Sequence, residues 1–384
     1  MTIAMMSGAL LLSLAAIVLS HLGLSALSLY AKNLISDVDF GNLLMNGMLS
    51  FLLFAGAMTI DLPSMKSQKW EVGILASVST IVSSLSIAWL LYFFLQWINT
   101  SIPLIFCLLF GALISPTDPI AVLATFKEIG APKKITSCVS GESLFNDGVG
   151  IVIFTTLFGL AFQHSDITWQ NILNIFLRQS VGGILYGMIL GYITNFLLKH
   201  SNDLKLTILI TLMIVTTGYQ FALLLNISGA LAMVVAGMMA GHYMQNHLND
   251  TMKNSVFNFW ELIDEILNAI LFLLLGFEIL VIHVSGLQLI AMLCIIPLVL
   301  LVRMITVATP LRFFLRRSYQ RYTISILTWG GLRGGLAVAL ALSIPKSNYR
   351  DFILALTYSV VAFAIIIQGS TIKSLAKLAT TKPE

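Results

Sequence analysis

The sequence carries little charge: only 10% of its 384 residues are Asp, Glu, Lys or Arg, and 58% are hydrophobic. A soluble globular chain has about a quarter charged residues, so lipid is expected to surround much of this chain. The short segments of alternating polarity that mark a transmembrane β-barrel are also missing. Continuous apolar runs of ~20 residues recur instead, each long enough to cross a bilayer. The composition predicts an all-α polytopic membrane protein.

Enzyme and metal motifs are missing as well. The sequence has neither Gly-x-Ser-x-Gly nor His-Glu-x-x-His, so a membrane hydrolase is disfavoured. Its three cysteines, Cys107, Cys138 and Cys294, lie in apolar segments without metal-site spacing. The net charge of +4 comes from basic residues in short loops, which set topology rather than bind nucleic acid. We expect no enzyme activity, no cofactor and no nucleic-acid partner.

Twelve transmembrane helices are predicted from the apolar runs. The predicted spans are 2–20, 41–60, 71–97, 103–125, 135–162, 175–198, 204–224, 228–245, 258–282, 287–311, 321–343 and 350–371. Most Lys and Arg residues fall in alternate loops and in the C-terminal tail; the opposite loops hold only Lys32, Arg178, Lys346 and Arg350. The positive-inside rule then predicts a multi-pass protein of the cell (inner) membrane with a cytoplasmic C-terminus.

The fourth predicted helix contains Ser115-Pro116-Thr117-Asp118-Pro119. Two prolines three positions apart remove two backbone donors and disfavour helical geometry in the residues before them. We expect the helix to unwind here and to leave carbonyls free beside Asp118 at membrane depth. Such breaks are tolerated only in the protein interior or along a cavity. The alternative is a plain proline kink capped by Asp118.

Gly141-Glu142-Ser143-Leu144-Phe145-Asn146-Asp147 lies in the fifth predicted helix. Helical spacing stacks Ser143 above Asp147 and Glu142 above Asn146, on adjacent stripes. A polar helix–helix contact could explain Ser143 and Asn146. It does not explain two carboxylates, each of which needs a proton or a partner to stay buried.

A second interruption is predicted at Trp329-Gly330-Gly331-Leu332-Arg333-Gly334-Gly335, because glycines weaken a helix. Close helix packing through small residues is the alternative. The two interruptions occupy corresponding places in the two halves of the chain. This predicts inverted repeats whose interrupted helices cross at mid-membrane.

The charges inside these segments suggest a division of roles. Arg333 needs an anion, and Glu142 is the best candidate for a buried structural ion pair. Asp147 is then the carboxylate left to exchange a cation for a proton. Arg303 could extend to the membrane interface or pair with Glu278.

The stretches GALISPTDPIAVLATFKEIGAPKKI, GESLFNDGVGIVIF and TWGGLRGGLAVALALSIP resemble the NhaP/NHE-type sodium/proton exchanger branch of the monovalent cation:proton antiporters. The resemblance implies one membrane transporter unit over 1–384. It also implies ion-binding core helices around 103–162 and 321–371, a dimerisation scaffold formed by the other helices, and assembly as a homodimer. It implies that Asp147 is the cation- and proton-binding residue, that Asn146 is its partner, and that Ser143 and the backbone oxygen of Thr117 are further Na⁺ ligands. It also identifies Asp118 as the carboxylate of the first broken helix, and Glu142 with Arg333 as the structural pair.

Two departures from the family pattern stand out. Many relatives have an acidic residue where this chain has Ala55, in Phe54-Ala55-Gly56. The family also commonly has thirteen helices with the N-terminus outside, so a count of twelve fits loss of the first helix.

The function predicted from these residues is exchange of Na⁺ or Li⁺ for H⁺ by alternating access, with both ions competing for Asp147. Exchange is expected to be electroneutral, because Asn146 cannot ionise. A role in pH homeostasis follows. K⁺/H⁺ exchange and, less favoured, a cation channel are the alternatives, and a channel would need a pore lining or carbonyl filter that the sequence does not suggest.

Overall fold

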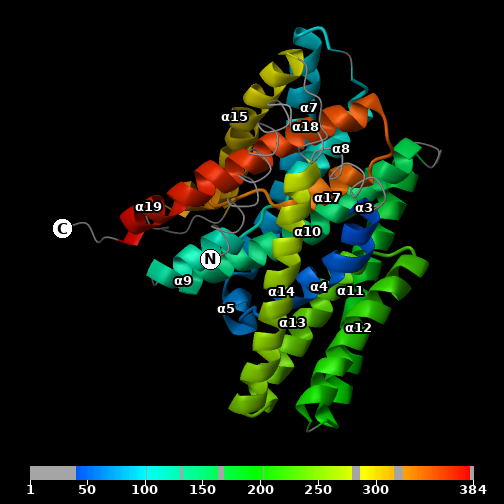
Figure 1. Cartoon of the computed structure of the whole chain (residues 1–384), viewed down its shortest axis with the longest axis vertical. Helices are drawn as coiled ribbons and strands as arrows, with labels where there is room; N and C mark the ends of the chain where they lie inside the picture. The colour runs from blue at the N-terminus through cyan, green and yellow to red at the C-terminus, as the bar shows by residue number, and fades with distance from the viewer. Residues whose placement is uncertain are drawn as a thin grey trace, which may run out of the picture. The chain divides into compact units, whose positions relative to one another are not determined.

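A computed structural model describes residues 40–100, 102–129, 133–162, 168–201, 203–278, 286–314 and 323–380. The described residues are almost entirely helical (Figure 1), with no β-strand among them beyond a single bridging pair, Asp118 and Leu332. The predicted helix at 2–20 lies outside these residues. Every later predicted span contains helix, and most ends agree within a few residues. The all-α prediction is confirmed.

Long apolar helices dominate the described ranges. Six of the helices there are long and apolar enough to cross a membrane: Lys69–Trp97, Thr136–Phe162, Gln170–Lys199, Leu204–Leu224, Gln288–Arg312 and Asn348–Ala376. Several leave large apolar side chains exposed, such as Ile189 and Tyr192 on one helix and Leu293 on another. Apolar surface of this extent is stable against lipid and not against water.

The chain divides into two compact units, and each is described by itself. Unit 1 comprises residues up to Leu44, Ser79–Pro132 and the chain from Asn268 onward. Its helical elements are α3 (Phe40–Leu43), α7 (Thr80–Trp97), α8 (Leu104–Ile114), α9 (Ile120–Ile129), α15 (Gly286–Thr309), η4 (Pro310–Phe314), α16 (Thr323–Trp329), α17 (Gly335–Ser343), α18 (Asn348–Phe363), η5 (Ala364–Gln368) and α19 (Gly369–Thr380).

Unit 2 comprises Met45–Val78 and Lys133–Leu267. Its elements are η1 (Leu44–Met48), α4 (Leu49–Met58), α5 (Leu62–Ser67), α6 (Lys69–Gly73), η2 (Ile74–Ser79), α10 (Lys133–Phe162), α11 (Trp169–Lys199), α12 (Leu204–Leu224), α13 (Gly229–His247) and α14 (Asp250–Glu278). The last turns of α14, from Asn268, belong to unit 1.

The core of unit 2 is formed by α13, which packs against α4, α11 and α12 (Figure 1). Gly187 of α11 lets the helices approach closely, since a Cβ there would lie 2.7 Å from the Ala232 carbonyl oxygen. Gly237 of α13 plays the same part against α4, at 2.7 Å from the Phe54 carbonyl oxygen. Small residues at such contacts are typical of helices that pack inside membranes.

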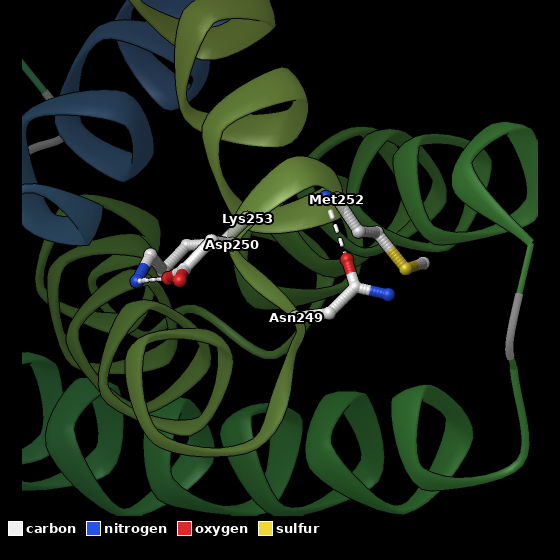
Figure 2. Close-up of polar contacts among 4 residues, drawn as sticks. All are labelled: Asn249, Asp250, Met252 and Lys253. Atoms are coloured by element: carbon white, nitrogen blue, oxygen red, sulfur yellow. Dashed lines mark hydrogen bonds and ion pairs between the residues drawn. The ribbon is translucent and has the colours of Figure 1, made fainter.

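The start of α14 shows how a polar sequence begins a helix (Figure 2). The Asn249 side chain accepts a hydrogen bond from the Met252 backbone N–H at 2.8 Å, which caps the first turn. Asp250 sits at the positive end of the helix dipole and accepts from Lys253 Nζ at 2.6 Å. The hydrogen bond and charge of Lys253 lower the pKa of Asp250 from its ordinary value.

Candidate functional site

The first break lies between α8 and α9, where Ser115–Pro119 leave the helix. α8 ends at Ile114, just before the first proline, and α9 begins at Ile120, just after the second. The side chains of Ser115 and Thr117 are buried, so the irregular backbone lies in the protein interior. The predicted unwinding is confirmed, and the plain proline kink is excluded.

The second break lies between Trp329, the last residue of α16, and Gly335, the first of α17. Gly334 has no room for a side chain, because a Cβ there would lie 2.7 Å from Asp118 Cβ. Gly331 is similarly confined: its Cβ would lie 2.7 Å from Arg303 Nε and 3.2 Å from Thr117 Cγ2. The glycines thus allow the two breaks to touch, which confirms the predicted interruption.

The two breaks join by a backbone hydrogen bond. The Asp118 N–H donates to the Leu332 carbonyl at 2.8 Å, and the two residues form an isolated antiparallel bridge. The predicted crossing of the interrupted helices is therefore present within unit 1. The Asp118 side chain is partly exposed at this crossing, beside Gly334.

Arg333 caps the end of α8 from the second break. Its Nη1 donates to the carbonyl of Ser115 and, at 2.7 Å, to that of Pro116. These carbonyls lie at the negative end of the α8 dipole, where a guanidinium is favourable. Because Arg333 is only 2% exposed, the interaction is little screened by water. One arginine thus binds the carbonyls that the prolines free.

Arg303 and Gln368 hold the other interrupted helix. Arg303 Nη2 donates to the Leu327 carbonyl at 3.2 Å, and Gln368 Nε2 donates to the Trp329 carbonyl at 3.0 Å. Both side chains are buried, so Arg303 does not extend to an interface as one sequence alternative had it. Pairing of Arg303 with Glu278 involves a side chain outside the described part. Sequence reasoning missed Gln368, although an amide within the apolar run Ala364–Gln368 was a usable signal.

The remaining predicted site residues lie on α10 in unit 2. Glu142 and Ser143 are each 2% exposed and Asn146 is fully buried, whereas Asp147 is partly exposed. The spacing places all four on one broad arc of the helix, as predicted. Of the two carboxylates on the arc, Asp147 is therefore the more exposed.

Contacts of α10 within unit 2 show which way this arc faces. Gly141, Leu144 and Gly148 form the packing side: their neighbours are Val72, Gly56 and Leu231, from α6, α4 and α13. The helical periodicity puts the polar arc roughly opposite to this side. The polar arc is therefore not part of the α10 surface that packs against Val72, Gly56 and Leu231.

Chemically, the α10 arc offers a carboxylate, a hydroxyl and an amide. Oxygen ligands of these kinds suit a hard cation such as Na⁺. The carboxylate can take a proton instead, and the amide cannot ionise. Thr117 and Arg333 belong to unit 1, so Thr117 as a ligand and the Glu142–Arg333 pair stay predictions.

Comparison with known proteins identifies the family. Residues 2–378 match the model of the transmembrane sodium/hydrogen exchangers. The chain belongs to this family. The Na⁺/H⁺ antiporter NhaP of Pseudomonas aeruginosa is 40% identical over 382 residues, which cover 98% of this chain and 90% of the relative. The Na⁺/H⁺ antiporter NhaH of Halobacillus dabanensis is 36% identical over 332 residues, covering 85% of this chain and 80% of the relative.

The fold of this exchanger family member is also found in a solved structure. The sodium proton antiporter MjNhaP1 of Methanocaldococcus jannaschii aligns over 100% of both chains with a TM-score of 0.76 and 21% sequence identity. This likeness bears on the fold. It agrees with the multi-pass helical architecture described above.

Proposed function

We propose that this exchanger moves Na⁺ or Li⁺ in one direction and H⁺ in the other, with both ions competing for Asp147. The proposal rests on the polar arc of α10, where the partly exposed Asp147 lies among buried polar groups. It also rests on the membership of this chain in the sodium/hydrogen exchanger family. Relatives whose sequences match over most of this chain are named Na⁺/H⁺ antiporters.

Competition for one carboxylate couples the two ion fluxes. A bare carboxylate is costly to carry through a low-dielectric barrier, whereas one neutralised by Na⁺ or H⁺ is not. The carrier therefore changes its open side only when loaded. Ser143 and Asn146 complete the cation shell on α10, and Thr117 is proposed as a further ligand.

The crossing in unit 1 supports this cycle as a rigid frame. Arg333, Arg303 and Gln368 satisfy carbonyls of both half-helices, so the broken backbone keeps its shape without water. In this proposal Glu142 is neutralised by Arg333 and does not titrate during exchange.

We place the protein in the cell (inner) membrane with its C-terminus in the cytoplasm, as the distribution of Lys and Arg favours. We propose that it works as a homodimer. Cysteine labelling of a residue in the C-terminal tail, in intact cells and in inverted vesicles, tests the orientation. Labelling from outside intact cells would overturn it.

Dye-quench assays in proteoliposomes with an imposed pH gradient test the transport itself. Added Na⁺ or Li⁺ should dissipate the gradient, added K⁺ should do so less, and Asp147→Asn should abolish the response. An imposed Na⁺ gradient should drive protons uphill, which a channel cannot do. Exchange by Asp147→Asn at the wild-type rate would overturn the assignment, and a stronger response to K⁺ than to Na⁺ would overturn the ion preference.

Electroneutral exchange follows from a single titrating group. Moving one net charge would couple transport to voltage by about 2.3 kcal/mol per 100 mV. Proteoliposomes clamped with K⁺ and valinomycin should therefore show one Na⁺-driven rate at all potentials. A rate that rises with potential would show that a second group, such as Asp118, carries a proton.

A further inference from the structure

A broad groove on unit 1 borders the second break at Trp329, and none of the residues proposed above to bind Na⁺ or H⁺ lines it. This open groove has a volume of about 830 Å³ and is bordered by α15, η4, α16 and α19. Residues from four elements line it: Ile305 and Thr309 from α15, Arg312 from the adjoining η4, Thr328 from α16, and Thr371 and Leu375 from α19. We propose that this groove binds an anionic phospholipid, with its headgroup phosphate at Arg312 and its acyl chains along α15.

The wall formed by α15 has the character of a lipid-facing surface. Met304 and Ile305 are 49% and 51% exposed, and Leu301 one turn earlier is 51% exposed. The apolar lining of the groove is thus continuous with the exposed apolar face of a helix long enough to span a membrane. Acyl chains can enter from the side, and such an opening does not favour a water-soluble solute.

The charge at one end of the groove fits a phosphate. Arg312 lines the groove and is exposed, and among the described lining residues none is acidic. The sequence continues with Arg316, Arg317 and Arg321, so positive charge accumulates after the apolar run of α15. Basic pockets between membrane helices on the cytoplasmic side recognise anionic headgroups. In the topology proposed above, this end faces the cytoplasm.

The walls also carry polar groups suited to the ester region of a lipid. Thr328 Oγ1 is buried and has no hydrogen-bond partner among the described residues, although it lines the groove. Because this oxygen is covered in the present conformation, the Thr328 side chain must rotate about χ1 before its hydroxyl can donate a hydrogen bond to an ester or phosphate oxygen. Trp329 forms a firm wall beside it, because its indole N–H donates to Thr371 at 2.8 Å and its ring packs edge-on against Phe363. A tryptophan with one polar contact is typical of the membrane interface.

The third helix, α19, supports the same assignment. Ile372 and Ala376 are buried on its inner side, whereas Lys373 pairs with Glu128 of α9. Its charged side chains are Lys373 and Lys377, and it has no acidic residue. A helix that buries apolar residues and contains basic but no acidic residues is suited to lie at an anionic membrane surface.

Thermal unfolding of the purified full chain in mild detergent tests the proposal, with phosphatidylglycerol, phosphatidylcholine or inorganic phosphate added. Phosphatidylglycerol should raise Tm of the wild type more than phosphatidylcholine does, and phosphate alone should not. Arg312→Gln should weaken the apparent affinity for phosphatidylglycerol roughly fivefold, the effect expected of one basic residue at an anionic surface. Ala308→Trp fills the groove and should abolish the shift.

Lys199→Gln is the matched control, because Lys199 is also an exposed basic residue at the end of a long membrane helix. It should behave as wild type. Equal shifts in all four proteins, or a full shift with phosphate alone, would overturn the proposal. So would an Ala308→Trp protein that binds phosphatidylglycerol normally. Native mass spectrometry of the wild type gives a second readout, and preferential retention of phosphatidylcholine would contradict it. Neither measurement depends on ion exchange.

Discussion

The two breaks of unit 1 interrupt their helices by different means. The first contains two prolines, which stop α8 and delay α9 whatever surrounds them, since their rings exclude helical hydrogen bonds. The second contains glycines, which permit a break without enforcing one. Its geometry is held by contacts from elsewhere: Arg303 of α15 and Gln368 of η5 bind the last carbonyls of α16. The first break is therefore set locally, and the second depends on its neighbours.

Arg333 links the two breaks, because it belongs to the second and binds carbonyls of the first. Arg333→Ala should have the largest effect on stability. It leaves two buried carbonyls unsatisfied, at about 1–3 kcal/mol each. Arg178→Ala is the matched control, since Arg178 also donates to a carbonyl, that of Leu225 at 2.8 Å, but is exposed. Thermal melts of both variants should differ widely, and equal Tm values would show that Arg333 does not hold the crossing.

Gly334→Ala tests the contact between the two breaks by adding a methyl group where they touch. The added Cβ would meet Asp118 at its Cβ, close to the backbone, so the strand-like bridge must shift at an overpacking cost of about 1–3 kcal/mol. We expect transport to fall strongly. Gly331→Ala meets the side chains of Arg303 and Thr117 and should be milder. Gly73→Ala, with nothing within 4 Å, should be silent. If the Gly334→Ala protein transports at the wild-type rate, transport does not require the close contact between the two breaks.

Gln368→Leu tests whether the second break depends on its neighbours. The change removes the hydrogen bond to the Trp329 carbonyl, which should lower the free energy of unfolding by about 1 kcal/mol and slow exchange. Gln220→Leu is its control, because Gln220 also donates from Nε2 to a carbonyl, that of Asn46 at 3.3 Å, at an exposed position. If the two variants have the same free energy of unfolding and the same transport rate, the second break does not depend on the contact from Gln368.

Asn249→Ala should have the smallest consequence for function. Loss of the α14 cap should cost about 1 kcal/mol of stability, yet the residue is far in sequence from both breaks. Transport at a temperature well below Tm should be unchanged. If Asn249→Ala loses transport as well as stability, the slower transport of Gln368→Leu would be explained by general destabilisation alone.

The same contrast explains what sequence could predict. Pro116 and Pro119 determine backbone geometry by themselves, so the first break and its position follow from the sequence. The arc of α10 follows as well, because helical periodicity alone aligns Ser143 with Asp147. Gln368 was missed because its partner is a carbonyl 39 positions away, which no local pattern reveals. For the same reason the Arg333 bonds to Ser115 and Pro116 were not anticipated; the sequence suggested a carboxylate for Arg333 but gave no sign of these carbonyls.

Competition between Na⁺ and H⁺ for Asp147 is the central claim, and the pH dependence of the apparent KM for Na⁺ tests it most directly. In proteoliposomes clamped at zero potential, KM should rise about tenfold for each pH unit below the pKa of the site, while the maximal rate at saturating Na⁺ stays nearly constant. Asp147→Asn should show no Na⁺-driven exchange at any pH. A KM that is independent of pH, with a maximal rate that changes instead, would contradict competition at one carboxylate.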